Sequence, residues 1–197
     1  GRDTRFGEPP YTRLELLVEA LQVAVAPYLD KPFAFFGHSM GALVSYELIR
    51  ALACRGSENP RHLFASACRP PHLPSAGLVL HTLPERKLIA ELIALGGIPR
   101  EIAELPDLLQ LFVPVIRADL TVCETYQFAS APALPVPLLV LGGTHDPRVP
   151  IDELRAWQTL TSARFSTETF PGGHFYLQTH EERLINLLKV TLNEACQ

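Results

Sequence analysis

The stretch that decides the fold reads Phe33-Ala34-Phe35-Phe36-Gly37-His38-Ser39-Met40-Gly41-Ala42-Leu43. Residues 33–36 are a short apolar run, as expected for a strand that is buried on both faces. Residues 37–41 match the pattern G-x-S-x-G, and helix formers then continue to about Arg55. A strand, a sharp turn and a helix in this order predict a nucleophile elbow, which presents the hydroxyl of Ser39.

The glycines of this turn have a steric reason. The serine of an elbow adopts a strained backbone conformation, and we expect Gly37 and Gly41 to come too close together to carry side chains. At the start of the helix, the N–H of Met40 is expected to face an oxyanion that forms beside Ser39. The alternative is a chance Gly-Ser-Gly turn, against which the flanking strand and helix both argue.

Composition limits the classes of function. The 197 residues are 47% hydrophobic and 19% charged, which is ordinary for a globular domain with a core. A formal net charge of −4 argues against a nucleic-acid partner. The sequence shows no apolar run that suggests a membrane span and no signal-peptide pattern. The cysteines are far apart, which indicates free thiols in a reducing cytoplasm rather than disulfides or a metal site: Cys54, Cys68, Cys123 and Cys196.

The rest of the chain alternates helical and strand patterns. A capping box of Thr12 and Glu15 predicts a helix that ends near Asp30. Further strands are expected over 63–68, 137–143 and 164–170, and further helices over 151–160 and 180–195. This order predicts an α/β fold with a mostly parallel sheet flanked by helices, in a single domain over residues 1–197.

Residues 81–129, which we call the lid, interrupt this alternation. They contain short helical segments separated by prolines and by Gly96-Gly97. Two apolar stripes run along them: Leu88, Leu92 and Leu95, then Leu108, Leu109, Phe112, Val113 and Ile116, followed by Leu120. A helical insertion between two strands of such a core usually caps the active-site end of the sheet. A plain structural layer of helices is the alternative.

Three side chains match the arrangement that activates a serine. An imidazole takes the hydroxyl proton, and a carboxylate holds the imidazole in the required tautomer. In this architecture the three groups follow successive strands in the order Ser, Asp, His. Ser39, Asp146 and His174 occur in that order, each just past a predicted strand.

Each partner of the serine has rivals. Asp152 is better explained as a helix cap, and Asp119 is a candidate for lid contact only. His38 belongs to the elbow and should point away from the hydroxyl, while His145 adjoins Asp146 too closely to serve as base. The remaining histidines are interpreted as solvated loop or surface groups: His62, His72, His81 and His180.

At this point the sequence resembles the type II thioesterases of the α/β-hydrolase superfamily. These accompany polyketide synthases and nonribosomal peptide synthetases, and the vertebrate medium-chain thioesterase of fatty-acid synthesis is a relative. The segments that carry the resemblance span nearly the whole chain: Gly1-Arg2, Glu8-Pro9-Pro10, residues 31–43, 95–99, 116–120 and 124–126, Asp146-Pro147, Trp157 and residues 171–177.

The resemblance implies hydrolysis of acyl thioesters on the 4′-phosphopantetheine arm of acyl or peptidyl carrier domains, to remove misprimed or stalled acyl groups. Ser39 would be acylated, His174 would act as base and then as acid, and Asp146 would orient His174. We expect no cofactor or metal of the protein's own, and a cytoplasmic monomer. Candidates for substrate contact are Asp119, Leu120, Phe112 and Phe175.

The sequence departs from the family pattern at its start. Relatives begin with a further segment that carries early strands and a loop whose N–H is the second oxyanion donor, so Met40 is the only donor named here. We therefore expect a truncated chain with residues 33–36 as an exposed apolar edge, folding poorly or turning over slowly. Two other functions stay open: a carboxylester hydrolase with the same three residues, and a non-catalytic module that binds a carrier or partner.

Overall fold

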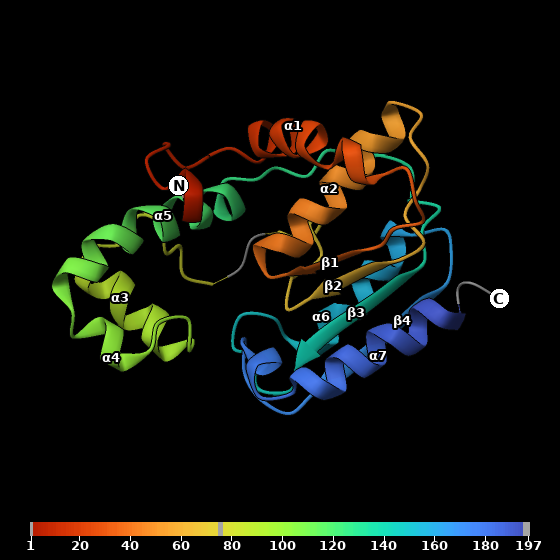
Figure 1. Cartoon of the computed structure of the whole chain (residues 1–197). Coiled ribbons are helices and arrows are strands. Elements are labelled where there is room, and N and C mark those ends of the chain that lie inside the picture. Colours follow the sequence, from red (N-terminus) through yellow and green to blue (C-terminus); the bar gives the residue numbers. More distant parts are fainter. Residues whose placement is uncertain (1, 75–76, 195–197) are drawn as a thin grey trace.

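The computed structural model describes residues 2–74 and 77–194 (Figure 1). Its centre is a parallel sheet with strand order β1-β2-β3-β4. The strands are β1 (Phe35–His38), β2 (Leu63–Ser66), β3 (Leu138–Gly143) and β4 (Phe165–Phe170). Parallel neighbours bring all four carboxyl ends to one edge of the sheet. The expected parallel sheet flanked by helices is confirmed.

Helices cover both faces of this sheet. On one face lie α2 (Met40–Cys54) and α6 (Ile151–Leu154), which continues as a 3-10 helix over Arg155–Leu160. Helix α1 (Leu14–Val25) packs on α2, and α7 (Glu181–Glu194) covers the opposite face. Short 3-10 helices occupy Asp3–Arg5, Ala26–Tyr28 and Tyr176–Gln178.

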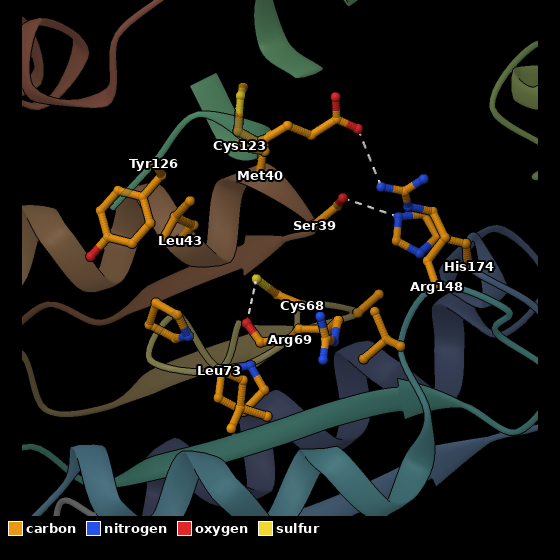
Figure 2. A pocket seen from close by; sticks show the side chains of 15 residues that line it. Ser39, Met40, Leu43, Cys68, Arg69, Leu73, Cys123, Tyr126, Arg148 and His174 are labelled. Carbon is orange, nitrogen blue, oxygen red and sulfur yellow. Dashed lines mark hydrogen bonds and ion pairs between the residues drawn. The ribbon is translucent and has the colours of Figure 1, made fainter. Parts of the chain in front are cut away.

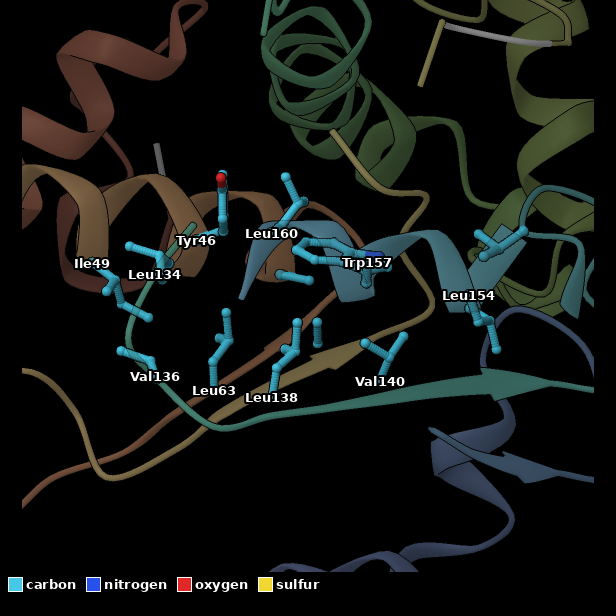
Figure 3. Packing of buried hydrophobic residues seen from close by; sticks show 13 residues of the cluster. Tyr46, Ile49, Leu63, Leu134, Val136, Leu138, Val140, Leu154, Trp157 and Leu160 are labelled. Carbon is cyan, nitrogen blue, oxygen red and sulfur yellow. The ribbon is translucent and has the colours of Figure 1, made fainter. Parts of the chain in front are cut away.

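The core follows from the alternation of side chains along buried strands. Leu63 and Ala65 point toward α2, whereas Phe64 between them packs on the side of α7. The largest side chain of the first cluster is Trp157, which is fully buried and donates its indole N–H to the carbonyl of Cys68 at 2.9 Å (Figure 3). This bond satisfies the polar atom of an otherwise apolar group.

Strand β1 differs from its prediction. It begins at Phe35, two residues later than expected, and it continues into the elbow as far as His38. It lies at one edge of the described sheet, and Phe36 is 41% exposed. Burial on both faces is therefore wrong for this strand, because nothing among the described residues covers the side chain of Phe36 fully. The expected exposed apolar edge is confirmed within the described residues.

The N-terminal helix also differs from its prediction. Helix α1 is capped by Arg13 without a side-chain hydrogen bond, so the capping box of Thr12 and Glu15 is wrong. A box needs the threonine at the cap, and here the helix begins one residue too late for that pairing. The carboxylate of Glu15 lies 3.4 Å from Arg13 instead. At the other end of the chain, α7 is described as far as Glu194, and Ala195, where the expected helix ends, lies outside the described residues.

The lid is helical, as predicted. It contains α3 (Glu85–Ala94), α4 (Arg100–Ala103) and α5 (Pro106–Glu124), which lie between β2 and β3 in the chain. These helices stand beside the sheet at its carboxyl edge and have an apolar cluster of their own (Figure 1). Among the described residues, no helix is both long and apolar enough to cross a membrane.

Candidate active site

Ser39 sits on a strained turn between β1 and α2. Its backbone has φ 54° and ψ −119°, a conformation that is rare for a residue with a side chain. A Cβ on Gly37 would lie 2.1 Å from the carbonyl oxygen of Gly41, so that position requires glycine. A Cβ on Gly41 would meet nothing within 4 Å. The expected crowding therefore holds at Gly37 and is wrong at Gly41, whose Cβ would point into open space from the first turn of α2.

The structure brings Ser39, His174 and Asp146 into contact. Nε2 of His174 lies 3.0 Å from Oγ of Ser39, and Nδ1 lies 2.7 Å from Oδ2 of Asp146. Asp146 can only accept at this contact, so Nδ1 carries the proton and Nε2 accepts from the hydroxyl. Both His174 and Asp146 are buried. This is the tautomer that a base at Ser39 requires.

Two loops position the imidazole and the carboxylate. Asp146 follows β3, and its Oδ1 accepts the backbone N–H of Arg148 at 2.8 Å. His174 follows β4 after a turn in which Gly172 has φ +120°. A Cβ on Gly143 would lie 2.3 Å from the carbonyl oxygen of Gly173, so a side chain there would push the two loops apart. Glycines at the ends of the strands thus allow the two loops to approach each other.

The two rival carboxylates lie elsewhere. Asp119 pairs with Arg2, whose Nη1 lies 3.2 Å from Oδ1. Asp152 is exposed in the first turn of α6, where the cap is Pro150 and no side chain caps the helix. The interpretation of Asp152 as a cap is wrong, because this residue lies within the helix. Its negative charge in the first turn still stabilises α6 through the helix dipole.

A buried polar chain lies behind the imidazole, and the sequence analysis missed it. Nδ1 of His38 lies 2.8 Å from Oγ of Ser66, which lies 2.6 Å from the hydroxyl of Tyr176. The rings of His38 and His174 are 5.3 Å apart. Burial, and secondarily the charge of His174, lowers the pKa of His38 to about 4. His38 is therefore neutral at pH 7. A neutral neighbour suits His174, because a second positive charge nearby would oppose the charge that His174 must take up.

Of the histidines beside β2, His62 is buried, contrary to its interpretation as a solvated group, whereas His72 and His81 are partly exposed. His62 is only 5% exposed and stacks on Phe64 with 4.4 Å between ring centroids. Burial, and secondarily Arg164, lowers the pKa of His62 to about 4. His81 bonds to Glu124 at the base of the lid. The other contacts are His72 with Phe128, His145 with Thr144, and His180 with the carbonyl of Pro171.

Two cavities meet at Ser39. The first, which we call the lid cavity, has a volume of about 390 Å³ and is roofed mainly by apolar residues: Leu80, Leu92, Leu95, Ile116, Leu120 and Phe175. The second, the loop cavity, has about 170 Å³ and is lined by the loop after β2 and by α2 (Figure 2). Ser39, Met40, Cys123, Glu124, Arg148 and His174 line both. A group attached to Ser39 can therefore extend to either side.

The proposed contact residues fall into two groups. Asp119, Leu120 and Phe175 line the lid cavity. Phe112 also belongs to the lid, but it is 47% exposed and lines neither of these two cavities. Helix α5 turns its buried positions, such as Leu109 and Val113, toward the lid cluster, and Phe112 falls on its outer side.

The thiols near the site are poor nucleophiles. Cys54, Cys68 and Cys123 are free, and Cys196 lies outside the described residues. Burial raises the pKa of Cys68 to about 12 and raises that of Cys123 as well. No cluster of potential metal ligands occurs in the described part of the chain. Ser39 is thus the nucleophile that the geometry favours.

Comparisons with known proteins agree with this geometry. A family model described as a thioesterase domain matches residues 1–191. Linear gramicidin dehydrogenase LgrE of Brevibacillus parabrevis is 42% identical over 195 residues, which are 98% of this chain and 74% of that protein. RedJ, a thioesterase from the prodiginine pathway of Streptomyces coelicolor, matches with a TM-score of 0.91 and 36% identity, over 97% of this chain and 76% of that one. The type II thioesterase YbtT, from the yersiniabactin NRPS/PKS pathway, matches with a TM-score of 0.88 and 32% sequence identity. The match covers 99% of this chain and 80% of that one.

Proposed function

Because this chain belongs to the thioesterase family, we propose that it removes acyl groups from the carrier domains of polyketide or nonribosomal peptide synthases by serine catalysis. It is an enzyme, a hydrolase that acts on thioester bonds. The observation that carries the proposal is the Ser39–His174–Asp146 contact at the boundary of an apolar cavity. The acyl group arrives on a 4′-phosphopantetheine arm, and the protein needs no cofactor of its own. We further propose a cytoplasmic monomer.

The first half-reaction acylates the serine. As Oγ of Ser39 attacks the thioester carbonyl, Nε2 of His174 takes the hydroxyl proton over the 3.0 Å contact. The carbonyl oxygen becomes an oxyanion, and the N–H of Met40, the first residue of α2, is the donor we assign to it. Collapse of the intermediate breaks the C–S bond, and His174 returns the proton to the departing thiolate.

The second half-reaction releases the acid. Water gives a proton to Nε2 of His174 and attacks the acyl carbonyl, and the proton then returns to Oγ of Ser39 as the ester bond breaks. In both steps the imidazole is transiently a cation, which the buried carboxylate of Asp146 stabilises. The neutral ring of His38 adds no opposing charge.

The lid cavity is suited to the acyl chain. Its apolar roof favours hydrocarbon, since burying each methylene contributes about 0.8 kcal/mol. The loop cavity on the other side of Ser39 has more polar walls, which include Arg69, a residue that does not line the lid cavity. We assign it to the end of the pantetheine arm, which carries amide groups. The acyl carbonyl then lies at the wall that both cavities share, beside Ser39.

The proposal is tested with an acyl group loaded on a carrier domain. Wild type and Ser57→Ala, a control in a loop outside the site, should release the acid, whereas Ser39→Ala should lose at least about a thousandfold in rate. The matching oxygen ester should react more slowly than the thioester; equal or faster hydrolysis would favour a carboxylester hydrolase. If wild type releases nothing and a fluorophosphonate probe does not label Ser39, a binding module is the better account.

A further inference from the structure

The lid and the loop that carries Asp146 meet at one buried carboxylate, that of Glu124. It belongs to the last residue of α5, and its side chain is only 6% exposed. The backbone N–H of Leu80 donates to it at 3.0 Å and that of His81 at 2.9 Å, while Nδ1 of His81 lies 2.7 Å away. On its other side, Nη2 of Arg148 lies 3.5 Å from Oε1. A buried carboxylate is stable only with such donors around it.

These donors come from segments that are distant in sequence. Leu80 and His81 lie in the connection from β2 into α3, at the start of the lid. Arg148 lies two residues after Asp146, and its own backbone N–H holds the carboxylate of Asp146 at 2.8 Å. Glu124 thus ties together the first residues of the lid, its last helix and the loop of the catalytic acid.

A second side chain of α5 fastens the same connection. Arg117, two helical turns before Glu124, donates to the carbonyl oxygens of His81 and Leu83, the latter at 2.9 Å. The connection is therefore held to α5 by a carboxylate that accepts its N–H groups and by a guanidinium that donates to its carbonyls. This pairing satisfies backbone groups on both sides of the peptide chain and fixes its register on the helix.

The position of Glu124 relates this junction to the substrate. Glu124 and Arg148 both belong to the wall that the lid cavity and the loop cavity share beside Ser39. Figure 2 shows the side chain of Arg148 next to His174, with its ion pair close to the Ser39–His174 contact. A displacement of this wall would therefore move the roof of the lid cavity relative to the serine.

We propose that Glu124 is a positioning residue for the hydrolysis of longer acyl groups. It acts through Leu80, His81 and Arg148, which it holds so that a chain bound under the lid presents its carbonyl to Ser39. Asp146 accepts from the backbone N–H groups of Arg148 and Val149 and makes no contact with Glu124 itself, so we expect the chemistry at His174 to persist when Glu124 is changed. The inference rests on the proposed function, because it concerns the same substrate.

The test compares Glu124→Gln with wild type on a dodecanoyl and an acetyl group, each loaded on a carrier domain. The glutamine side chain has the shape of glutamate but carries no charge. Its NH₂ group cannot accept the hydrogen bonds of the N–H groups that it faces. KM for the dodecanoyl substrate should rise about tenfold or more, the effect of losing a charged hydrogen bond. The acetyl group does not reach the lid, so its kcat/KM should change less than about twofold.

Glu153→Gln is the matched control. Its carboxylate also pairs with an arginine, Arg69, but it lies outside the lid and is 28% exposed. Glu153→Gln should leave the ratio of kcat/KM between the dodecanoyl and acetyl substrates unchanged. Arg148→Met should reproduce the effect of Glu124→Gln, and the double variant should lose no more than either single one, because both changes break one contact.

Four results would contradict the inference, and only the last of them also contradicts the proposed function. Equal losses on both substrates would mean that Glu124 only stabilises the fold, and additive losses in the double variant would mean that the contact with Arg148 is irrelevant. Wild-type hydrolysis with an unchanged substrate ratio in Glu124→Gln contradicts this inference alone. Absence of hydrolysis by wild type contradicts the proposed function and this inference together.

Discussion

The α/β core and the lid meet over Ser39, but each is held together in its own way. In the core, every residue of β2 and β3 is buried, and Ser39, Asp146 and His174 follow β1, β3 and β4 of the same sheet. The lid instead packs around a separate apolar cluster: Leu80, Leu88, Leu92, Ile98, Leu109 and Val113. The lid also reaches two core clusters, through Val122 at the end of α5 and through Tyr126 and Phe128 after it.

Polar contacts also join the lid to the core. The hydroxyl of Tyr126 donates to Glu47 at 2.6 Å, Arg50 donates to the carbonyl of Ala129 at 2.8 Å, and Glu124 pairs with Arg148. The comparison suggests a division of work: core packing fixes the reacting atoms, and an independently packed insertion sets the space for the acyl group. Substitutions in the two parts should then have separable effects on chemistry and on chain selection.

The largest effect is expected in the core, at Asp146. The amide of Asp146→Asn cannot stabilise a cationic His174 and favours the wrong tautomer, so kcat should fall about 10⁴-fold for short and long acyl groups alike. Asp152 is the rival carboxylate and provides the control: Asp152→Asn should keep wild-type kcat. A loss below about tenfold in Asp146→Asn would remove this residue from the mechanism and break the assignment of the chemistry to the core.

The two elbow glycines test how strictly the core fixes Ser39. Gly37→Ala places a Cβ 2.1 Å from a carbonyl oxygen, so the elbow must shift, at a cost of about 4 kcal/mol in the free energy of unfolding. Gly41→Ala meets nothing and lies in α2, where alanine is favoured by about 1 kcal/mol. Urea unfolding measures both changes. Equal destabilisation by the two variants would contradict the steric account of the turn.

The smallest effect concerns how the free energy of unfolding changes at acid pH. It involves His62, which is buried in the core beside β2. The pKa of His62 is about 4 in the folded chain and near 6.5 when unfolded, so the unfolded state binds more protons between these values. Stability is therefore lost as the pH falls through this window. The free energy of unfolding falls between about pH 7 and pH 5, and in His62→Phe this fall should be smaller by about 2 kcal/mol. An unchanged pH dependence would show that His62 charges freely in the folded state.

Motifs that depend on local sequence could be predicted well. The elbow is a strand, a turn and a helix in direct succession, and the order of Ser39, Asp146 and His174 follows from the connectivity of a parallel sheet. The helical lid also follows from local patterns, because prolines and apolar spacing mark its segments.

Features that depend on distant partners could not be predicted. The apolar residues of α5 form a wide band, and the sequence does not say that Leu120 faces the cavity while Phe112 faces outward. His62 looks like a loop histidine until the ring of Phe64 is placed beside it. Glu124 appears in the sequence as one helical carboxylate, and its role arises from partners 24 to 44 positions away.

One measurement tests the division between core and lid most directly. Leu120→Phe fills part of the lid cavity from α5, and Phe112→Ala changes the outer side of the same helix. On carrier-bound dodecanoyl and acetyl groups, Leu120→Phe should lower kcat/KM for dodecanoyl at least about tenfold and leave acetyl within about twofold, because the excluded volume lies along the chain and not at Ser39. Phe112→Ala should change neither. Equal losses on both substrates in Leu120→Phe, or an unchanged ratio, would contradict the account.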